Sequence, residues 1–141
     1  QGDTLSPSMF IFFINLCLRH LMSSGVGHVH RCGVKRNTTC FADDIALMTH
    51  SAEDMNVLLR KVDDFAQWSG MELCLLKCEI AAHDFATDQE LDVTSIRMRG
   101  KQLKKLSSQS SYKYLGVRLS ITGNTKQERD YVLNACRRAA N

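Results

Sequence analysis

The sequence predicts an α+β domain with a small, mostly antiparallel sheet packed on helices. Two stretches, at residues 7–22 and 52–69, have helical character, and short strand-like runs lie between and after them. Hydrophobic residues make up 44% of the 141 residues and charged residues 23%, which is an ordinary composition for a folded domain and excludes disordered and collagen-like chains. No apolar run reaches the roughly 18 residues of a membrane-spanning helix.

The first helix is expected to begin at Ser6 and Pro7, because a serine N-cap followed by proline at the first helical position is a typical helix start. The stretch that follows, to about Met22, is apolar nearly all round, so we expect this helix to be buried. Residues 28–34 then read as a strand, and residues 35–37 as a turn.

A hairpin with two acidic residues at its tip is predicted next. Residues 39–42 and 45–49 are short strand-like runs that flank Asp43 and Asp44. Adjacent carboxylates repel each other, so folding does not favour them here, whereas Mg²⁺ takes carboxylate oxygens together with substrate phosphates. Only one of the two can lie squarely on the metal side, because adjacent strand residues point to opposite faces. An ordinary aspartate turn is the alternative.

The second helix is predicted from a serine cap at Ser51, acids in the first turn, and Gly70 as the residue that ends it. Its apolar residues repeat every three or four positions and therefore share one face: Met55, Leu58, Leu59, Val62, Phe65 and Ala66.

The remainder of the chain is expected to hold shorter elements. Short strands are predicted at residues 71–76 and 79–83, a polar loop at 85–92, an exposed connection at 102–111, a strand at 114–119 and a last helix at 124–140. The last helix should make its apolar contacts through Tyr131, Val132, Leu133 and Cys136.

The net charge of +3 conceals segregated segments. Residues 1–42 carry +3, residues 43–92 carry −9, and residues 93–127 carry eight bases and no acid. An acid-free basic stretch suits contact with a polyanion such as nucleic acid, and a solvated basic loop is the alternative.

Six cysteines permit three disulfides, but no secretory signal opens the chain, so reduced thiols in an intracellular protein are expected. A zinc site is the alternative. His28, His30 and Cys32 alternate along the predicted strand, and Cys40, Cys74 and Cys78 follow, but the Cys-x2-Cys pair that is usual in structural zinc sites is absent from the sequence.

Four blocks carry a family pattern, at residues 1–7, 41–44, 70–79 and 112–117. In this order they resemble the reverse transcriptases of non-LTR (LINE-type) retrotransposons, with those of group II introns as more distant relatives. The family's Gln-Gly-x-x-Leu-Ser-Pro motif matches Gln1, Gly2, Leu5, Ser6 and Pro7, and its Tyr/Phe-Ala-Asp-Asp motif matches Phe41, Ala42, Asp43 and Asp44. Its Gly-Leu-x-x-Asn-x-x-Lys motif matches Gly70 and Lys77, with Met71 and Cys74 in place of leucine and asparagine.

The resemblance implies RNA-directed DNA polymerase activity by a two-metal mechanism, with two Mg²⁺ ions or Mn²⁺ in their place, and with Asp43 as a metal ligand supported by Asp44. Gln1 and Gly2 would lie beside the incoming nucleotide and the template base. Phe41 would pack under the turn and near the primer, with core packing as its alternative, and Lys77 would lie near the nucleotide phosphates, with a surface lysine as its alternative.

Two further regions are assigned by the same resemblance. Tyr114, Leu115 and Gly116 resemble the primer-grip hairpin that holds the primer end. The basic run at residues 97–118 would bind the nucleic-acid backbone. Its phosphate contacts would come from Arg97, Arg99, Lys101, Lys104, Lys105 and Lys113.

The family layout implies an incomplete polymerase palm at residues 1–123 and a helix at the palm–thumb connection at residues 124–141. The implied partners are an RNA template, a DNA primer, a deoxynucleoside triphosphate, and the fingers, thumb and endonuclease of a parent polyprotein, with no membrane. Localisation in the nucleus after cytoplasmic synthesis follows from the family.

The family's first catalytic aspartate stands on a strand before the Gln-Gly motif, so we expect a palm fragment that is inactive by itself. An unpaired sheet edge and uncovered apolar surface would make it weakly stable or prone to aggregation. Two alternatives stay open: a nucleic-acid-binding module without catalysis, with or without zinc, and a decayed element copy, which Cys74 would suit.

Overall fold

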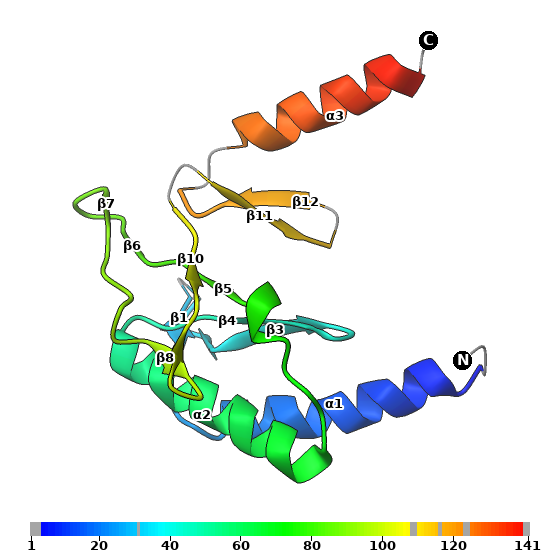
Figure 1. Cartoon of the computed structure of the whole chain (residues 1–141), viewed down its shortest axis with the longest axis vertical. Helices are drawn as coiled ribbons and strands as arrows, with labels where there is room; N and C mark the ends of the chain where they lie inside the picture. Colours follow the sequence, from blue (N-terminus) through cyan, green and yellow to red (C-terminus); the bar gives the residue numbers. More distant parts are fainter. Residues whose placement is uncertain (1–3, 31, 108–109, 116, 123–124, 140–141) are drawn as a thin grey trace. The chain divides into compact units, whose positions relative to one another are not determined.

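The computed structural model describes residues 4–30, 32–107, 110–115, 117–122 and 125–139. In this part of the chain three α-helices, α1 (Ser6–Met22), α2 (Ala52–Ser69) and α3 (Lys126–Ala139), alternate with short strands, which confirms the α+β class (Figure 1). The described strands pair as six two-stranded sheets, five antiparallel and one parallel, where one small sheet was expected. Among the described helices, none is long and apolar enough to cross a membrane.

The chain forms two compact units. The first comprises Gln1–Lys77 and Thr94–Leu103, and the second comprises Cys78–Val93 and Lys104–Asn141. The boundary expected between residues 123 and 124 rests on the family layout and stays a prediction.

Helix α1 begins one residue earlier than a serine cap at Ser6 requires. Leu5 is the N-cap, with φ −83° and ψ −23°, and no side chain caps this end. Because Leu5 already has helical dihedral angles, Ser6 is the first helical residue and its hydroxyl is not in the capping position. The prediction of a Ser6 cap is wrong, and Pro7 is the second helical residue where the first was expected.

Only one face of α1 is covered. Ile14, Cys17 and Leu21 are buried, whereas the opposite side exposes large apolar residues: Met9, Ile11, Phe12, Leu16 and Met22. The expectation of a helix buried all round is therefore wrong, because α2 and the hairpin of β3 and β4 pack against a single side.

The segment after α1 forms a short two-stranded sheet. Strands β1 (His28–Val29) and β2 (Lys35–Arg36) pair antiparallel, so residues 35–36 are a strand and the predicted turn at 35–37 is wrong. The turn lies earlier, where the Val34 carbonyl accepts from the His30 amide at 2.9 Å and Gly33 has φ +78°. Glycine adopts this left-handed conformation without steric cost, which places the turn there.

Asn37 fastens the end of α1 to the start of the hairpin. Its side chain is buried, and its amide nitrogen donates to the carbonyl oxygens of Leu21 at 2.7 Å and Val26 at 3.2 Å. Gly27 permits this close approach, since a Cβ there would lie 2.8 Å from the Arg36 carbonyl oxygen. The amide group therefore ties the last turn of α1 and the loop after it to the residue that precedes β3.

Helix α2 follows its predicted signals. The Ser51 hydroxyl accepts a hydrogen bond from the Asp54 amide at 3.1 Å, and Gly70 ends the helix with φ +72°. Four of the six residues of the predicted apolar face are buried, namely Leu58, Leu59, Phe65 and Ala66. The cap, the end and the face are confirmed.

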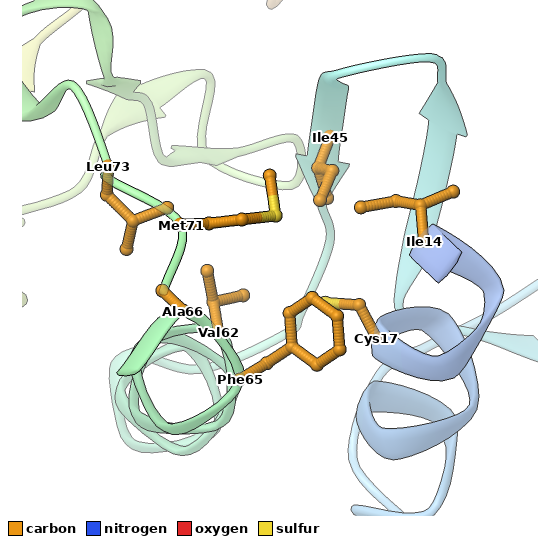
Figure 2. Close-up of a pocket in the computed structure, with 8 residues that line it drawn as sticks. All are labelled: Ile14, Cys17, Ile45, Val62, Phe65, Ala66, Met71 and Leu73. Atoms are coloured by element: carbon orange, nitrogen blue, oxygen red, sulfur yellow. The ribbon is translucent and has the colours of Figure 1, made fainter. Parts of the chain in front are cut away.

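The core of the first unit joins both helices to the hairpin. Ile14, Cys17, Leu21, Leu58 and Phe65 form a buried cluster, and partly buried Cys40, Ile45 and Leu47 from β3 and β4 pack against it. Part of this core surrounds an apolar hollow of about 30 Å³, and Figure 2 shows the side chains that line it: Ile14, Cys17, Ile45, Val62, Phe65, Ala66, Met71 and Leu73. A hollow this small without polar partners holds no ligand, so it is a packing gap beneath the hairpin.

The connection after α2 differs from its prediction. Residues 71–76 form no strand, and a 3₁₀ turn, η1 (Leu75–Lys77), stands at their end. The strands that follow have two residues each: β5 (Glu79–Ile80), β6 (His83–Asp84), β7 (Gln89–Glu90), β8 (Arg97–Met98), β9 (Lys101–Gln102) and β10 (Lys104–Lys105). The exposed connection predicted at 102–111 contains a buried Leu103, which belongs to the first unit.

In the second unit, β11 (Ser111–Tyr114) and β12 (Val117–Ser120) form a hairpin where one strand over 114–119 was predicted. Helix α3 lies against β12 through polar contacts: the Glu128 carboxylate accepts from the Arg118 amide at 2.7 Å, and the Arg118 guanidinium lies 5.0 Å from the centre of the Tyr131 ring. The predicted apolar contacts of α3 are wrong, since Val132, Leu133 and Cys136 are exposed and Tyr131 is 45% exposed.

Candidate active site

The two predicted metal-binding acids lie at the tip of the hairpin. Strands β3 (Thr38–Phe41) and β4 (Asp44–Leu47) pair antiparallel with Phe41 opposite Asp44, so Ala42 and Asp43 form a two-residue loop. Ala42 has φ +51°, a conformation that residues with a side chain rarely adopt. Such strain persists where the surrounding structure enforces it, and it is found preferentially at functional sites.

Alternation along the two strands explains why the acids face outward. Cys40 and Ile45 are directly paired and both pack toward the helices, so their neighbours Phe41 and Asp44 lie on the other face. Asp43 and Asp44 are exposed, and Phe41 is 62% exposed. Core packing, the alternative interpretation of Phe41, is therefore wrong.

The carboxylates affect the thiol behind them. Burial, and then the negative charges of Asp43 and Asp44, raise the pKa of the Cys40 thiol above its ordinary value. The Cys40 thiol donates to the Ala42 carbonyl at 3.2 Å. Cys40 is thus held as a neutral thiol that supports the strained loop from its inner side.

The donor chemistry at the tip suits a hard divalent cation. Within the described residues, neither Asp43 nor Asp44 forms an ion pair, so both carboxylates are available as oxygen ligands. Mg²⁺ is commonly held by one or two carboxylates together with water and substrate phosphates. Among the described residues, no group of three His, Cys, Asp or Glu side chains is arranged so that it could hold a metal ion. This is true of the hairpin tip, and it is equally true of the zinc alternative at His28, His30 and Cys32.

Lys77 belongs to the same compact unit as the hairpin. It is the last residue of η1, where its amide donates to the Cys74 carbonyl at 3.0 Å, and its side chain is exposed. In the described part of the chain its ammonium group has no ion-pair partner. A lysine in this state can neutralise an incoming phosphate without first breaking another contact.

Some of the predicted site residues lie outside the part of the chain that the structure describes. Gln1 and Gly2 lie outside the described residues, and so does Gly116. Tyr114 ends β11 and is half-buried, and Leu115 occupies the hairpin turn with φ +51° and is 49% exposed. The primer-grip role of this hairpin stays a prediction.

The basic run is partly neutralised by acidic partners. Arg99 donates to Asp63 at 2.6 Å, Lys104 pairs with Glu79, and Lys105 pairs with Glu90 at 3.2 Å. Arg97 donates to the Gly100 carbonyl at 3.3 Å. Lys101 and Lys113 are exposed and have no ion pair among the described residues, so they are the bases most available to a phosphate backbone.

These acidic partners are not among the residues predicted from the sequence. The signal was nevertheless present, because a segment of charge −9 directly precedes a segment of charge +8. Opposite segments of this size in one small domain are expected to pair with each other before they meet a ligand.

The comparison with known families decides the class of this site. The family model described as reverse transcriptase (RNA-dependent DNA polymerase) matches residues 1–119, which include the acidic hairpin and Lys77. The chain belongs to the reverse transcriptase family. The resemblance to non-LTR retrotransposon enzymes is confirmed, and no solved structure matches this reverse transcriptase chain.

The similar proteins are all polyproteins of R2 elements. The Pol polyprotein from the type-2 retrotransposable element R2DM of Drosophila melanogaster is 30% identical over 129 residues, which are 89% of this chain and 12% of the polyprotein. That from the type-1 retrotransposable element R2 of Popillia japonica is 27% identical over 128 residues, 89% of this chain and 21% of the relative. The R2 polyprotein of Nasonia vitripennis is 26% identical over 121 residues, 83% of this chain and 12% of the relative. This reverse transcriptase chain therefore spans a small part of the relatives that it matches.

Proposed function

We propose that this chain is the palm segment of an RNA-directed DNA polymerase that acts within an R2-like retrotransposon polyprotein. The observation that supports this most directly is the pair of exposed carboxylates at the hairpin tip, one on the strained two-residue loop and one directly after it, inside a region that matches the reverse transcriptase family. Its substrates would be an RNA template, a DNA primer and a deoxynucleoside triphosphate, and its partners the fingers, thumb and endonuclease of the polyprotein.

Asp43 and Asp44 would hold Mg²⁺, or Mn²⁺ in its place, through their carboxylate oxygens, with Asp43 as the direct ligand. When bound, the two ions would supply Lewis-acid stabilisation of the charge that develops on the phosphate oxygens. The open position of the hairpin tip supports this assignment, because a carboxylate with no ion pair among the described residues loses no internal contact on binding a cation.

Residues of this chain would position the other reactants. Lys77 would neutralise the nucleotide phosphates or donate a proton to the leaving pyrophosphate. Phe41 presents an exposed ring one residue from the acidic loop, which suits contact with the primer end. Gln1 and Gly2 would contact the nucleotide and template base, Tyr114, Leu115 and Gly116 the primer, and Lys101 and Lys113 the phosphate backbone. The site of action would be the nucleus, after synthesis in the cytoplasm.

The decisive experiment measures primer extension on an RNA template by the parent polyprotein and by its Asp43→Ala variant. Removal of a metal ligand should lower the extension rate by roughly 10³-fold or more while template binding stays nearly unchanged, because several kcal/mol of transition-state stabilisation depend on the metal. Glu53→Ala, which removes an exposed carboxylate from the start of α2, is the matched control and should leave extension unchanged.

The chain of residues 1–141 alone belongs in the same assay. We expect it to be inactive, since its described residues bring two carboxylates to the hairpin tip and no third metal-binding side chain. Near-normal turnover by Asp43→Ala would remove Asp43 from the metal site, and Mg²⁺-dependent extension by the isolated chain would show that two acids suffice.

A further inference from the structure

A hollow between the two long helices of the first unit is separate from the acidic hairpin tip. His20 of α1 and Asp64, Phe65 and Trp68 of α2 line it, and its volume is about 230 Å³. Phe65 is buried, whereas Trp68 is 69% exposed, and the centres of the two rings lie 5.6 Å apart. One wall of the hollow is therefore an indole that remains largely open to solvent.

An exposed apolar ridge of α1 leads to this hollow. Phe12, Leu16 and His20 are spaced four residues apart, so they form one row along the helix surface. Phe12 is 73% exposed and Leu16 is 50% exposed. Exposed apolar side chains that adjoin a pocket are typical of a surface that another protein covers.

The charge at the hollow selects the kind of occupant. Asp64 lies one helical turn before Trp68 and is exposed, and it has no ion-pair partner in the described part of the chain. Its neighbour Asp63, by contrast, is paired with Arg99. A carboxylate beside an open indole face suits a guanidinium group, which can pair with the acid and stack on the ring. The same carboxylate repels a phosphate, which disfavours nucleic acid here.

The ridge of α1 and the hollow together form a surface that is called the docking groove below. We propose that it binds an amphipathic helix of a partner protein. This helix carries two apolar residues one turn apart, followed after another turn by an arginine. The apolar residues would cover the ridge of α1, and the arginine would enter the hollow between the Asp64 carboxylate and the Trp68 ring. The groove is defined by Phe12, Leu16, His20, Asp64, Phe65 and Trp68. This proposal does not depend on the polymerase function, since it uses none of the hairpin acids.

The chain offers a built-in reporter for the test, because Trp68 is its single tryptophan. The probe is a synthetic helical peptide with leucine, leucine and arginine at successive four-residue spacings on an alanine and glutamine background. Titration into the chain of residues 1–141 should change the Trp68 emission in a saturable way. A peptide with glutamate in place of the arginine should bind at least about tenfold more weakly, the loss expected for one charge-assisted hydrogen bond.

Variants locate the binding. Asp64→Asn keeps the size of the side chain and removes its charge, so it should weaken binding of the arginine peptide about tenfold or more. Leu16→Ala should also weaken binding, and Glu53→Gln, on the same helix as Asp64 but in its first turn, should not. Circular dichroism of each variant verifies that α1 and α2 are intact.

Three results would overturn the proposal: no saturable change with the arginine peptide, equal binding by Asp64→Asn, or a response to single-stranded RNA that exceeds the response to the peptide. If the free chain self-associates through this ridge, the arginine peptide should raise the soluble fraction of the unmutated chain and not that of Asp64→Asn. An equal effect on both would contradict the proposed arginine contact.

Discussion

At the scale of single residues, the conformation of Ala42 shows what the hairpin tip demands of the chain. A two-residue loop between Phe41 and Asp44 requires a sharp reversal, and Ala42 meets this requirement with φ +51°. Residues with a Cβ avoid this region, because the Cβ approaches the following carbonyl oxygen. The neighbouring Cys40 thiol, hydrogen-bonded to the Ala42 carbonyl, helps to hold it there.

Replacing Ala42 by glycine should therefore stabilise the chain. Relief of the left-handed strain outweighs the greater backbone entropy of glycine in the unfolded state, so we expect the free energy of unfolding to rise by roughly 0.5–1 kcal/mol. Ala42→Val should lower it, since a β-branched residue is more restricted at positive φ. Urea denaturation followed by Trp68 fluorescence measures both changes, and a loss of stability in Ala42→Gly would show that the loop is not strained.

Cys17 gives the folded state a dependence on alkaline pH. Burial, together with the nearby Cys40, raises the pKa of the Cys17 thiol from 9.0 to about 11. The folded state therefore holds this proton more tightly than the unfolded chain does. The stabilisation is fully present below pH 9 and is lost as the pH rises through about 11.

Urea denaturation of the unmutated chain and of Cys17→Ala, compared between about pH 8 and about pH 11, isolates this effect from the other alkaline titrations. We expect the variant to be less stable at the lower pH, because it leaves a cavity, and to lose less stability on going to the higher pH. Parallel curves for the two proteins would exclude Cys17 as the source of the pH dependence.

At this scale the sequence indicated the caps that depend on local chemistry alone. Ser51 and Gly70 have their predicted roles, because a hydroxyl at a helix start and a left-handed glycine at its end need only the adjacent backbone. Ser6 has no such role, since it is itself the first helical residue and Leu5 stands at the N-cap. The position of Asp43 and Asp44 at a hairpin tip was predictable from the sequence. The exposure of the Phe41 side chain was not, because it depends on which face of the hairpin packs on the core.

At the scale of elements, the segment of β8 and β9 is attached to α2 by polar side chains. Asn56 donates to the Ser95 carbonyl at 3.2 Å and accepts from the Arg97 amide at 3.3 Å, and Asp63 accepts from Arg99 at 2.6 Å. Met98, which belongs to β8 in this segment, is buried, with only 4% of its surface exposed. Two side chains of one helix thus hold the segment from Ser95 to Arg99, which contains a strand of only two residues.

Asn56→Ala should loosen this segment more than Asp63→Asn does. The alanine removes two hydrogen bonds to the backbone, which are worth about 0.5–1.5 kcal/mol each, whereas a partly exposed ion pair contributes about 1 kcal/mol or less. Hydrogen exchange at residues 94–103 measures the difference. Gln67→Ala, which removes only a side chain that donates to Asp63, is the control and should leave exchange in the segment nearly unchanged.

Should Asp63→Asn increase the exchange as much as Asn56→Ala does, the ion pair and not the Asn56 hydrogen bonds would hold the segment. The distinction matters for the proposed nucleic-acid surface, because Arg99 becomes available to phosphate only when it leaves Asp63.

Element prediction succeeded where the pattern was long enough to repeat. Helix α2 shows several turns of one-sided apolar spacing, and the hairpin of β3 and β4 shows two runs around a polar tip. The strands from β5 to β10 have two residues each, which is too short for alternation to appear in the sequence. Buried residues near them, such as Val93, Ile96 and Leu103, stand singly between exposed neighbours and lie outside the strands, so they do not mark where the strands are.

At the scale of the whole molecule, the buried apolar residues are distributed unequally between the two compact units. Among the described residues, the second unit buries Ile80 and Val93, whereas the first buries ten hydrophobic side chains, including Leu21, Leu58 and Phe65. Because apolar burial is the main favourable contribution to folding, the two units should differ in stability.

We therefore expect the second unit to open at lower urea concentration than the first. Trp68, the single tryptophan, lies in the first unit and reports its unfolding, while hydrogen exchange by mass spectrometry follows residues 104–139. Exchange of residues 104–139 should become rapid before the Trp68 emission changes. Coincident midpoints for both measurements would mean that the chain unfolds as one cooperative body.

The division into units also has a consequence for biosynthesis. Every member of the buried cluster that supports the acidic hairpin lies between Phe10 and Met71, so this cluster is complete in sequence before Cys78 is made. The ribosome then needs about 1–3 s, at roughly 5–20 residues per second, to add the stretch up to Thr94 that belongs to the second unit. The segment that holds β8, which packs on α2, is therefore always made after the hairpin and both of its helices are complete in sequence.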